Sequence, residues 1–259
     1  MGNLLIGTTA KLTVEQVLPW ARSFRKVSDA PAVMLCDDEK TYEALKEFKV
    51  EPVQAMVWPA GSGHNGIFNH RWGAIHQHLQ KVEKDTKVLV TDTKDVIFQR
   101  DPFEMMSPGM INVATEGHLG KYNPWVREQT ARMPNVLRPT LDNNPVICAG
   151  VWGSDAATAA QFSGDVYDLV RDWPSDVEQN GMNAVLQLLY KDKLNAIPYA
   201  RSWCAHLAQM YKPRGPAGRS EIIPEFRDGQ MWSGNNLFAI VHHVWWWKWP
   251  ELKSLVEAA

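Results

Sequence analysis

The first sixty residues alternate between short apolar runs and amphipathic segments. Three of these runs have the length and composition of buried strands: 4–6, 32–36 and 52–57. Between the first two runs, Thr13 is followed three residues later by Gln16, which is typical of a capped helix start. Apolar residues then recur at helical spacing as far as Phe24, and a shorter helical pattern covers 42–48. This strand–helix alternation predicts a parallel sheet with both faces covered.

The next predicted strand, at 87–90, ends in two acidic residues, Asp92 and Asp95. A glycine-rich loop at 61–66 and a helix precede it, and the helix presents one apolar face: Trp72, Ile75, Leu79 and Val82. Ligands of open α/β sheets gather at the carboxyl ends of the strands, so the position of the two acids matters as much as their identity.

The second half shows no linker and no change of composition. Two more strands are predicted at 111–114 and 145–148, and helices at 155–173 and 176–190. The segment 212–230 is rich in turn-forming residues, and we expect it to form a loop that could act as a lid. We therefore expect a single α/β domain with a mostly parallel open sheet flanked by helices.

Composition excludes several classes of function. The chain has 27 basic and 29 acidic residues, so its formal charge of −2 offers no general field for nucleic acid. The apolar run at 237–241 is far shorter than the roughly 20 residues that cross a bilayer, and no signal-peptide pattern opens the sequence. We expect a soluble, cytoplasmic protein with no transmembrane segment and no nucleic-acid partner. The Trp-rich segment 245–249 is compatible with a sugar-stacking surface, a membrane-interface surface or a tail packed on the body.

Asp92 and Asp95 supply hard oxygen ligands of the kind that Mg²⁺ and Mn²⁺ prefer, and substrate phosphate commonly completes such a site. The plain alternative is that Asp95 caps the following turn and that Asp101, before a proline, is a turn residue. Four histidines at 64, 70, 76 and 78 invite a zinc interpretation. Residues two apart on a helix point to different faces and no cysteine is near, which disfavours zinc.

The segment around the acids resembles the centre of GT-A-fold glycosyltransferases, which use nucleotide sugars. An arginine-bearing helix precedes a strand ending in Thr-Asp-Thr-Lys-Asp-Val-Ile-Phe-Gln-Arg-Asp-Pro-Phe at 91–103. Three further segments are similar to the same family and follow in its order: 144–153, 178–183 and 238–242. The resemblance implies a GT-A-like fold, with a nucleotide-binding half at about 1–105 and a sugar and acceptor half at about 106–259.

The resemblance also implies a site. It implies a metal-dependent transfer of a sugar from a nucleotide-diphosphate sugar to a glycan or glycoconjugate acceptor, with Mn²⁺ or Mg²⁺ as cofactor. The metal ligands it implies are Asp92, Asp95 and His242, with His243 as the competing assignment. The catalytic residue is Glu178, as general base or charge stabiliser. The nucleotide would meet Thr8, Thr9, Ala10, Asp38, Arg71 and Lys212, and the sugar or acceptor would meet Asn144, Gly150, Trp152, Gly153 and Gln179.

Two departures from the family pattern keep other interpretations open. The acids are three residues apart, with Lys94 where the family's second acid stands, and Glu178 replaces an Asp. Glu178 also fits a capping box begun by Ser175, and Asp38 fits a helix cap. A non-catalytic carbohydrate-binding or assembly protein is the main alternative function, followed by a haloacid-dehalogenase-like phosphohydrolase. No P-loop, GxSxG or GxGxxG motif occurs.

Overall fold

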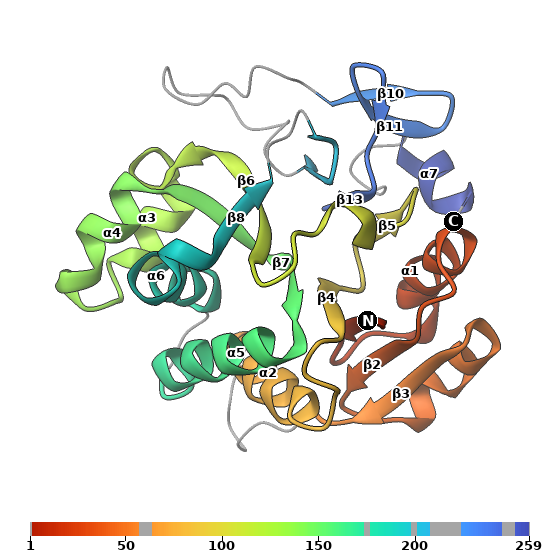
Figure 1. Ribbon diagram of the computed structural model, residues 1–259, viewed down its shortest axis with the longest axis horizontal. Coiled ribbons are helices and arrows are strands. Elements are labelled where there is room, and N and C mark those ends of the chain that lie inside the picture. Colours follow the sequence, from red (N-terminus) through yellow and green to blue (C-terminus); the bar gives the residue numbers. More distant parts are fainter. Residues whose placement is uncertain are drawn as a thin grey trace.

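The fold is an α/β architecture built on a seven-stranded mixed, mostly parallel open sheet (Figure 1). The computed structural model describes residues 2–56, 64–173, 177–197, 201–207, 224–244 and 252–258. In spatial order the strands of this sheet are β3 (Val50–Gln54), β2 (Ala32–Cys36), β1 (Asn3–Thr8), β4 (Lys87–Asp92), β7 (Pro145–Asp155), β6 (Ile111–Leu119) and β8 (Leu194–Ile197).

Helices cover both faces of this sheet. The α-helices are α1 (Val14–Val27), α2 (His64–Leu79), α3 (Pro124–Thr130), α4 (Arg138–Asn143), α5 (Ala156–Val170), α6 (Glu178–Leu189) and α7 (Lys253–Ala258). The 3₁₀ helices of the described chain are η1 (Lys40–Phe48), η2 (Phe103–Met105), η3 (Gly120–Tyr122), η4 (Asn135–Leu137) and η5 (Lys191–Lys193). The predicted βαβαβ opening is confirmed, except that its second helix, η1, is a 3₁₀ helix.

The helix start predicted at Thr13 is also confirmed. The side-chain oxygen of Gln16 accepts a hydrogen bond from the Thr13 N–H at 3.0 Å, which satisfies one of the donors exposed at a helix start. The helix α1 continues through Pro19 to Val27 and buries Trp20 and Phe24 against the sheet. The capping residues and the apolar face of this helix were therefore both predicted correctly from the sequence.

Alternating residues of β1 enter two separate cores. Leu4 and Ile6 pack with α2, α5 and α6, whereas Leu5 packs with α1 and η1 on the other face. Figure 1 shows α2 and α5 side by side beneath the sheet and α1 on its opposite side. In the first core, Trp152 of β7 stacks on Trp72 of α2 at 5.4 Å between ring centroids. This two-sided burial explains the continuous apolar runs of the central strands.

The strand β7 is much longer than predicted and is antiparallel to both of its neighbours. The apolar run predicted a strand over 145–148, and the family resemblance implied a strand followed by a turn within 144–153. The structure keeps Gly150 and Gly153 within the strand. A Cβ at Gly153 would lie 2.6 Å from the Val88 carbonyl oxygen, so glycine permits close packing there rather than a turn.

Two small three-stranded sheets complete the fold. One contains β5 (Val96–Phe98), β13 (Ile240–His242) and β9 (Cys204–His206), and the other contains β10 (Glu225–Arg227), β11 (Gln230–Ser233) and β12 (Asn236–Leu237). The predicted loop over 212–230 is thus wrong for 225–227 and for residue 230, which form strands around a turn with Gly229 at φ 74°. Residues 208–223 and the Trp-rich segment 245–249 lie outside the described residues. Among the described helices, none has the length and apolar character needed to span a membrane.

Candidate metal centre

Asp92, Asp95 and His242 converge at the carboxyl end of β4. The imidazole Nε2 of His242 lies 3.4 Å from Asp92 Oδ2 and 3.6 Å from Asp95 Oδ1. Strand pairing produces this arrangement, because His242 of β13 is in register with Val96 of β5, the residue directly after Asp95. The backbone N–H of Val244 also donates to the Asp95 carbonyl at 3.1 Å. Residues 147 positions apart in sequence are thereby fixed side by side.

The geometry of this group fits a divalent cation. Ligands about 2.1 Å from an octahedral metal lie about 3 Å from one another, and the two separations above are only slightly longer. His242 is fully buried, and its Nε2 makes no hydrogen bond of ordinary geometry to any described residue although it faces two carboxylates. Such an atom is costly in a folded protein unless something binds it. A cation between the three side chains would satisfy it.

Glycine at position 150 of β7 makes room for this group. A Cβ there would lie 2.4 Å from Asp92 Oδ2 and 2.4 Å from the Cε1 atom of His242. Both distances are shorter than any real contact of a Cβ, so a larger residue would push one ligand away. Gly150, which the sequence analysis assigned to sugar or acceptor binding, is therefore placed against the candidate metal ligands.

The surroundings of the group carry excess negative charge. In the described structure, four carboxylates (Asp92, Asp95, Glu116 and Glu178) gather around one arginine and His242. Burial alone would lower the pKa of His242, but the neighbouring carboxylates of Asp95 and Asp92 outweigh it and raise that pKa. Even a protonated His242 leaves more negative than positive charge, which favours a bound cation.

Arg71 of α2 holds two of these carboxylates. Its Nε and Nη2 donate to the two oxygens of Glu178 at 2.6 Å each, and its Nη1 donates to Asp92 Oδ1. Burial opposes the charged form of Arg71, but its two carboxylate partners raise its pKa and keep it charged. Burial also opposes ionisation of Asp92, yet Arg71 and His242 lower its pKa well below the ordinary range. Arg71 therefore fixes Asp92 as an anion with its second oxygen turned toward His242.

A pocket of about 250 Å³ opens beside the candidate ligands. The ends of β1 and β4 form it, because Thr8 and Asp92 are paired in the sheet and the Thr93 hydroxyl donates to the Thr8 carbonyl at 3.1 Å. Its lining contains four predicted nucleotide-binding residues and both acids: Thr8, Thr9, Ala10, Arg71, Asp92 and Asp95. Lys94 and an apolar wall complete it: Leu12, Met56, Ile67 and Phe68. The structure thus brings most of the predicted nucleotide site together.

Other predicted residues lie elsewhere or have different partners. Asp38 accepts hydrogen bonds from the Lys40 N–H at 3.2 Å and the Thr41 hydroxyl at 2.7 Å, one residue before the N-cap of η1, which is close to the capping role left open above. Asn144 donates to the Thr140 carbonyl at the end of α4. Lys212 lies outside the described residues, as does Ser175, the proposed capping partner of Glu178.

The predicted sugar platform at Trp152 is not found. The ring is 1% exposed, stacks on Trp72 and meets the edge of Phe162, so it belongs to the core. Gly153 packs on β4 as described above. Gln179 bridges other site residues, since it accepts from the Ala149 N–H at 3.4 Å and donates to Glu116 at 3.0 Å. It therefore supports the acidic cluster from α6.

His243 differs most clearly from expectation. Successive residues of a strand point to opposite faces, which predicted that His243 points away from His242. Instead, His243 has φ 62° and its ring stacks on that of His242 at 3.8 Å between centroids. The strand ends at His242, and the left-handed residue that follows folds back over it.

Several residues of the site were missed by the sequence analysis. Glu116 follows the apolar start of β6 and is 7% exposed, and a carboxylate just after a predicted buried strand was an available signal. Trp72 donates from Nε1 to Glu178 at 2.8 Å, whereas its position on an apolar helix face suggested only packing. Cys148 and His206 contact His242, and only the folded structure relates these distant residues.

Two of the four helical histidines have partners from α5. His76 Nδ1 lies 2.7 Å from the Ala160 carbonyl, and His70 Nδ1 lies 3.4 Å from the Tyr167 hydroxyl. Among the described side chains, the groups able to hold a metal ion all include His242 and none includes these histidines.

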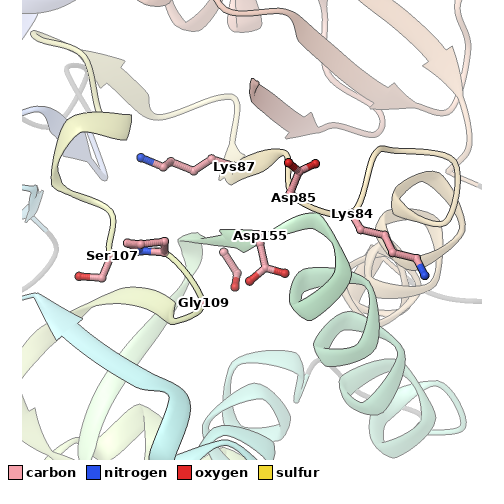
Figure 2. A pocket seen from close by; sticks show the side chains of 8 residues that line it. Lys84, Asp85, Lys87, Ser107, Gly109 and Asp155 are labelled. Atoms are coloured by element: carbon pink, nitrogen blue, oxygen red, sulfur yellow. The ribbon is translucent and has the colours of Figure 1, made fainter. Parts of the chain in front are cut away.

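A second pocket, of about 270 Å³, lies at the opposite end of β4 (Figure 2). It contains no residue predicted for the site. Figure 2 shows the ammonium groups of Lys84 and Lys87 pointing in opposite directions, so they do not converge on one ligand. Lys87 donates instead to the Phe103 carbonyl at 3.0 Å. We assign no chemistry to this pocket.

Comparison with known proteins adds no family. No family model matches the chain, and no curated protein matches it. The class that fold and site define is an α/β protein with an open mixed sheet and an Asp–Asp–His group at a strand end.

Proposed function

We propose that this protein is a metal-dependent glycosyltransferase with a GT-A-like fold, which transfers a sugar from a nucleotide-diphosphate sugar to a glycan or glycoconjugate acceptor. The observation that carries the proposal is the position of Asp92, Asp95 and His242 beside the pocket at the ends of β1 and β4. Ligands of open α/β sheets bind at such strand ends. The resemblance of four ordered segments to this family supports the same conclusion.

The proposed chemistry needs negative charge on the leaving diphosphate to be neutralised. A divalent cation held by Asp92, Asp95 and His242, Mn²⁺ or Mg²⁺, would act there as a Lewis acid. Lys94 is exposed at the pocket lining and supplies a second positive charge to the phosphates. The strand-end residues Thr8 and Thr9 line the same pocket and would position the nucleoside.

Glu178 has a different role in this proposal from the one expected from sequence. Its two oxygens accept three hydrogen bonds from Arg71 and Trp72, and its side chain is 10% exposed. It is not among the residues that line the pocket. We therefore propose that Glu178 is a positioning residue that orients Arg71, which in turn orients Asp92, and not a base acting on the sugar.

The proposal is tested by thermal-shift titration with UDP, GDP, dTDP and CDP, each with Mn²⁺ and with chelator. A ligand that binds only the folded state raises the melting temperature by mass action. We expect one diphosphate to stabilise the protein in the presence of Mn²⁺ only, and Asp95→Asn to abolish this response. Asp101→Asn is the matched control, because Asp101 accepts a hydrogen bond from the Phe103 N–H and lies outside the site.

The proposal is contradicted if none of the four diphosphates stabilises the protein in a metal-dependent way. It would favour the non-catalytic carbohydrate-binding or assembly protein considered from sequence. A response that survives in Asp95→Asn would instead remove Asp95 from the site.

A further inference from the structure

The two ring nitrogens of His242 face two different sets of ligands. Nε2 faces the carboxylates of Asp92 and Asp95, as described above. Nδ1 lies 3.5 Å from Cys148 Sγ and 3.1 Å from His206 Nδ1. One side of the imidazole is therefore surrounded by hard oxygen atoms, and the other by a thiol and a second imidazole.

His243 belongs to the second set through its backbone conformation. A non-glycine residue rarely adopts φ 62°, so the surrounding structure must hold His243 in this conformation. The result is that its ring lies over that of His242. One ligand atom each from Cys148, His242 and His243 then lie within 4.8 Å of one another.

This group has the composition of a soft-metal site. Thiolate and imidazole are the ligands that Zn²⁺ takes, at about 2.3 Å and 2.0–2.1 Å. Cys148 and His242 are buried, and His243 is half-buried. Burial and, after it, the nearby carboxylates of Glu116 and Asp92 raise the pKa of the Cys148 thiol, and the same carboxylates favour a bound cation here.

We propose that Cys148, His242 and His243 form a second metal site for a soft divalent cation such as Zn²⁺, and that its occupancy excludes a cation from Asp92, Asp95 and His242. Binding replaces the S–H bond of Cys148 with a sulfur–metal bond, and the proton is released to solvent. No change of oxidation state is involved.

Exclusion follows from the chemistry of imidazole. A neutral imidazole has one nitrogen with a free lone pair and one that carries hydrogen. When Nδ1 of His242 binds the soft cation, Nε2 carries the proton and donates toward Asp92 and Asp95. When Nε2 binds the hard cation, Nδ1 carries the proton and donates toward His206 or Cys148. This exclusion, unlike the second site itself, rests on the metal site of the proposed function.

Cobalt is the probe for the second site, because Co²⁺ bound to thiolate shows a sulfur-to-metal charge-transfer band in the near ultraviolet. We expect the band in the wild type, and we expect Cys148→Ser to abolish it. Cys204→Ser is the matched control, since Cys204 is an equally buried thiol that is not in the group, and it should retain the band. Asp95→Asn should also retain it. His243→Gln should weaken cobalt binding without unfolding, as checked by near-ultraviolet circular dichroism.

A wild type that lacks the band at saturating Co²⁺ overturns the second site, as does a band that survives in folded Cys148→Ser. If Cys148→Ser does not fold, undiminished cobalt affinity in His243→Gln overturns it. For exclusion, one equivalent of Zn²⁺ should weaken Mn²⁺ binding about tenfold more in the wild type than in Cys148→Ser, where Zn²⁺ can compete only at the Asp–Asp–His group itself. If Zn²⁺ leaves Mn²⁺ binding to the wild type unchanged, the exclusion is overturned but the second site is not. If the wild type shows the cobalt band but does not bind Mn²⁺, the proposed function is contradicted and the second site is not.

Discussion

Replacing Arg71 with Met tests whether the site depends on a buried ionic network. The substitution keeps an unbranched apolar stem. It removes the guanidinium hydrogen bonds to Glu178 and to Asp92 Oδ1, while the hydrogen bond from Trp72 to Glu178 remains. Breaking a buried ion pair by removing one partner costs about 3–5 kcal/mol. Glu178, 10% exposed, contributes most of this, while solvent screens Asp92, whose side chain is 29% exposed. Against a typical stability of about 5–15 kcal/mol, the loss is large.

The assay is urea unfolding at pH 7 followed by tryptophan fluorescence. Arg132→Met is the control, because Arg132 pairs with Glu128 on an exposed helical surface and its loss costs about 0.5 kcal/mol or less. Arg71→Met combined with Glu178→Gln should be more stable than Arg71→Met alone, since the buried negative charge on residue 178 is then removed together with the guanidinium. A loss below about 1 kcal/mol in Arg71→Met, or a double variant less stable than the single one, refutes the reasoning.

Three further predictions concern packing and reactivity. Gly150→Ala should lower the free energy of unfolding by about 1–3 kcal/mol and weaken Mn²⁺ binding, because its Cβ would meet Asp92 and His242. Gly2→Ala is the control, because a Cβ there would have no atom within 4 Å. It should change neither quantity when both are measured by calorimetry. Trp152→Ala should cost about 3–5 kcal/mol in urea unfolding through loss of its buried aromatic contacts; a loss as small as that of a surface substitution would contradict its place in the core. Burial and the nearby acidic side chains raise the pKa of Cys36 to about 12, so at pH 8 only about one thiol in 10⁴ is ionised, and Ellman's reagent should react with it only after unfolding. Fast reaction of Cys36 in the native protein would disprove its burial.

Sequence patterns predicted the features that depend on local signals. The helix after Thr13 and the strand at 32–36 were placed correctly, since capping and apolar runs are properties of neighbouring residues. The acids Asp92 and Asp95 were found because they directly follow a buried strand. What places His242 beside them is the pairing of β13 with β5, which no sequence pattern predicted. The choice of His242 as a metal ligand came only from a family resemblance.

Other features could not be predicted because distant residues determine them. Gly150 was expected to contact a sugar or acceptor, yet it lies in β7, where Asp92 and His242 occupy the space that a side chain would need. Trp152 was expected to face a sugar, but Trp72 and Phe162 cover it from two helices. An alternating strand pattern predicts that the His243 side chain points away from the site. Its left-handed backbone conformation instead places the His243 ring against that of His242. For Gly150 and Trp152 the deciding contacts are made by residues far away in sequence.

The most direct test of the central claim is calorimetric titration of the purified protein with Mn²⁺ alone, after chelator treatment. We predict one binding site in the wild type and in Asp101→Asn, and loss of that site in Asp95→Asn. Equal Mn²⁺ affinity in the wild type and in folded Asp95→Asn would show that the Asp–Asp–His group is not the metal centre.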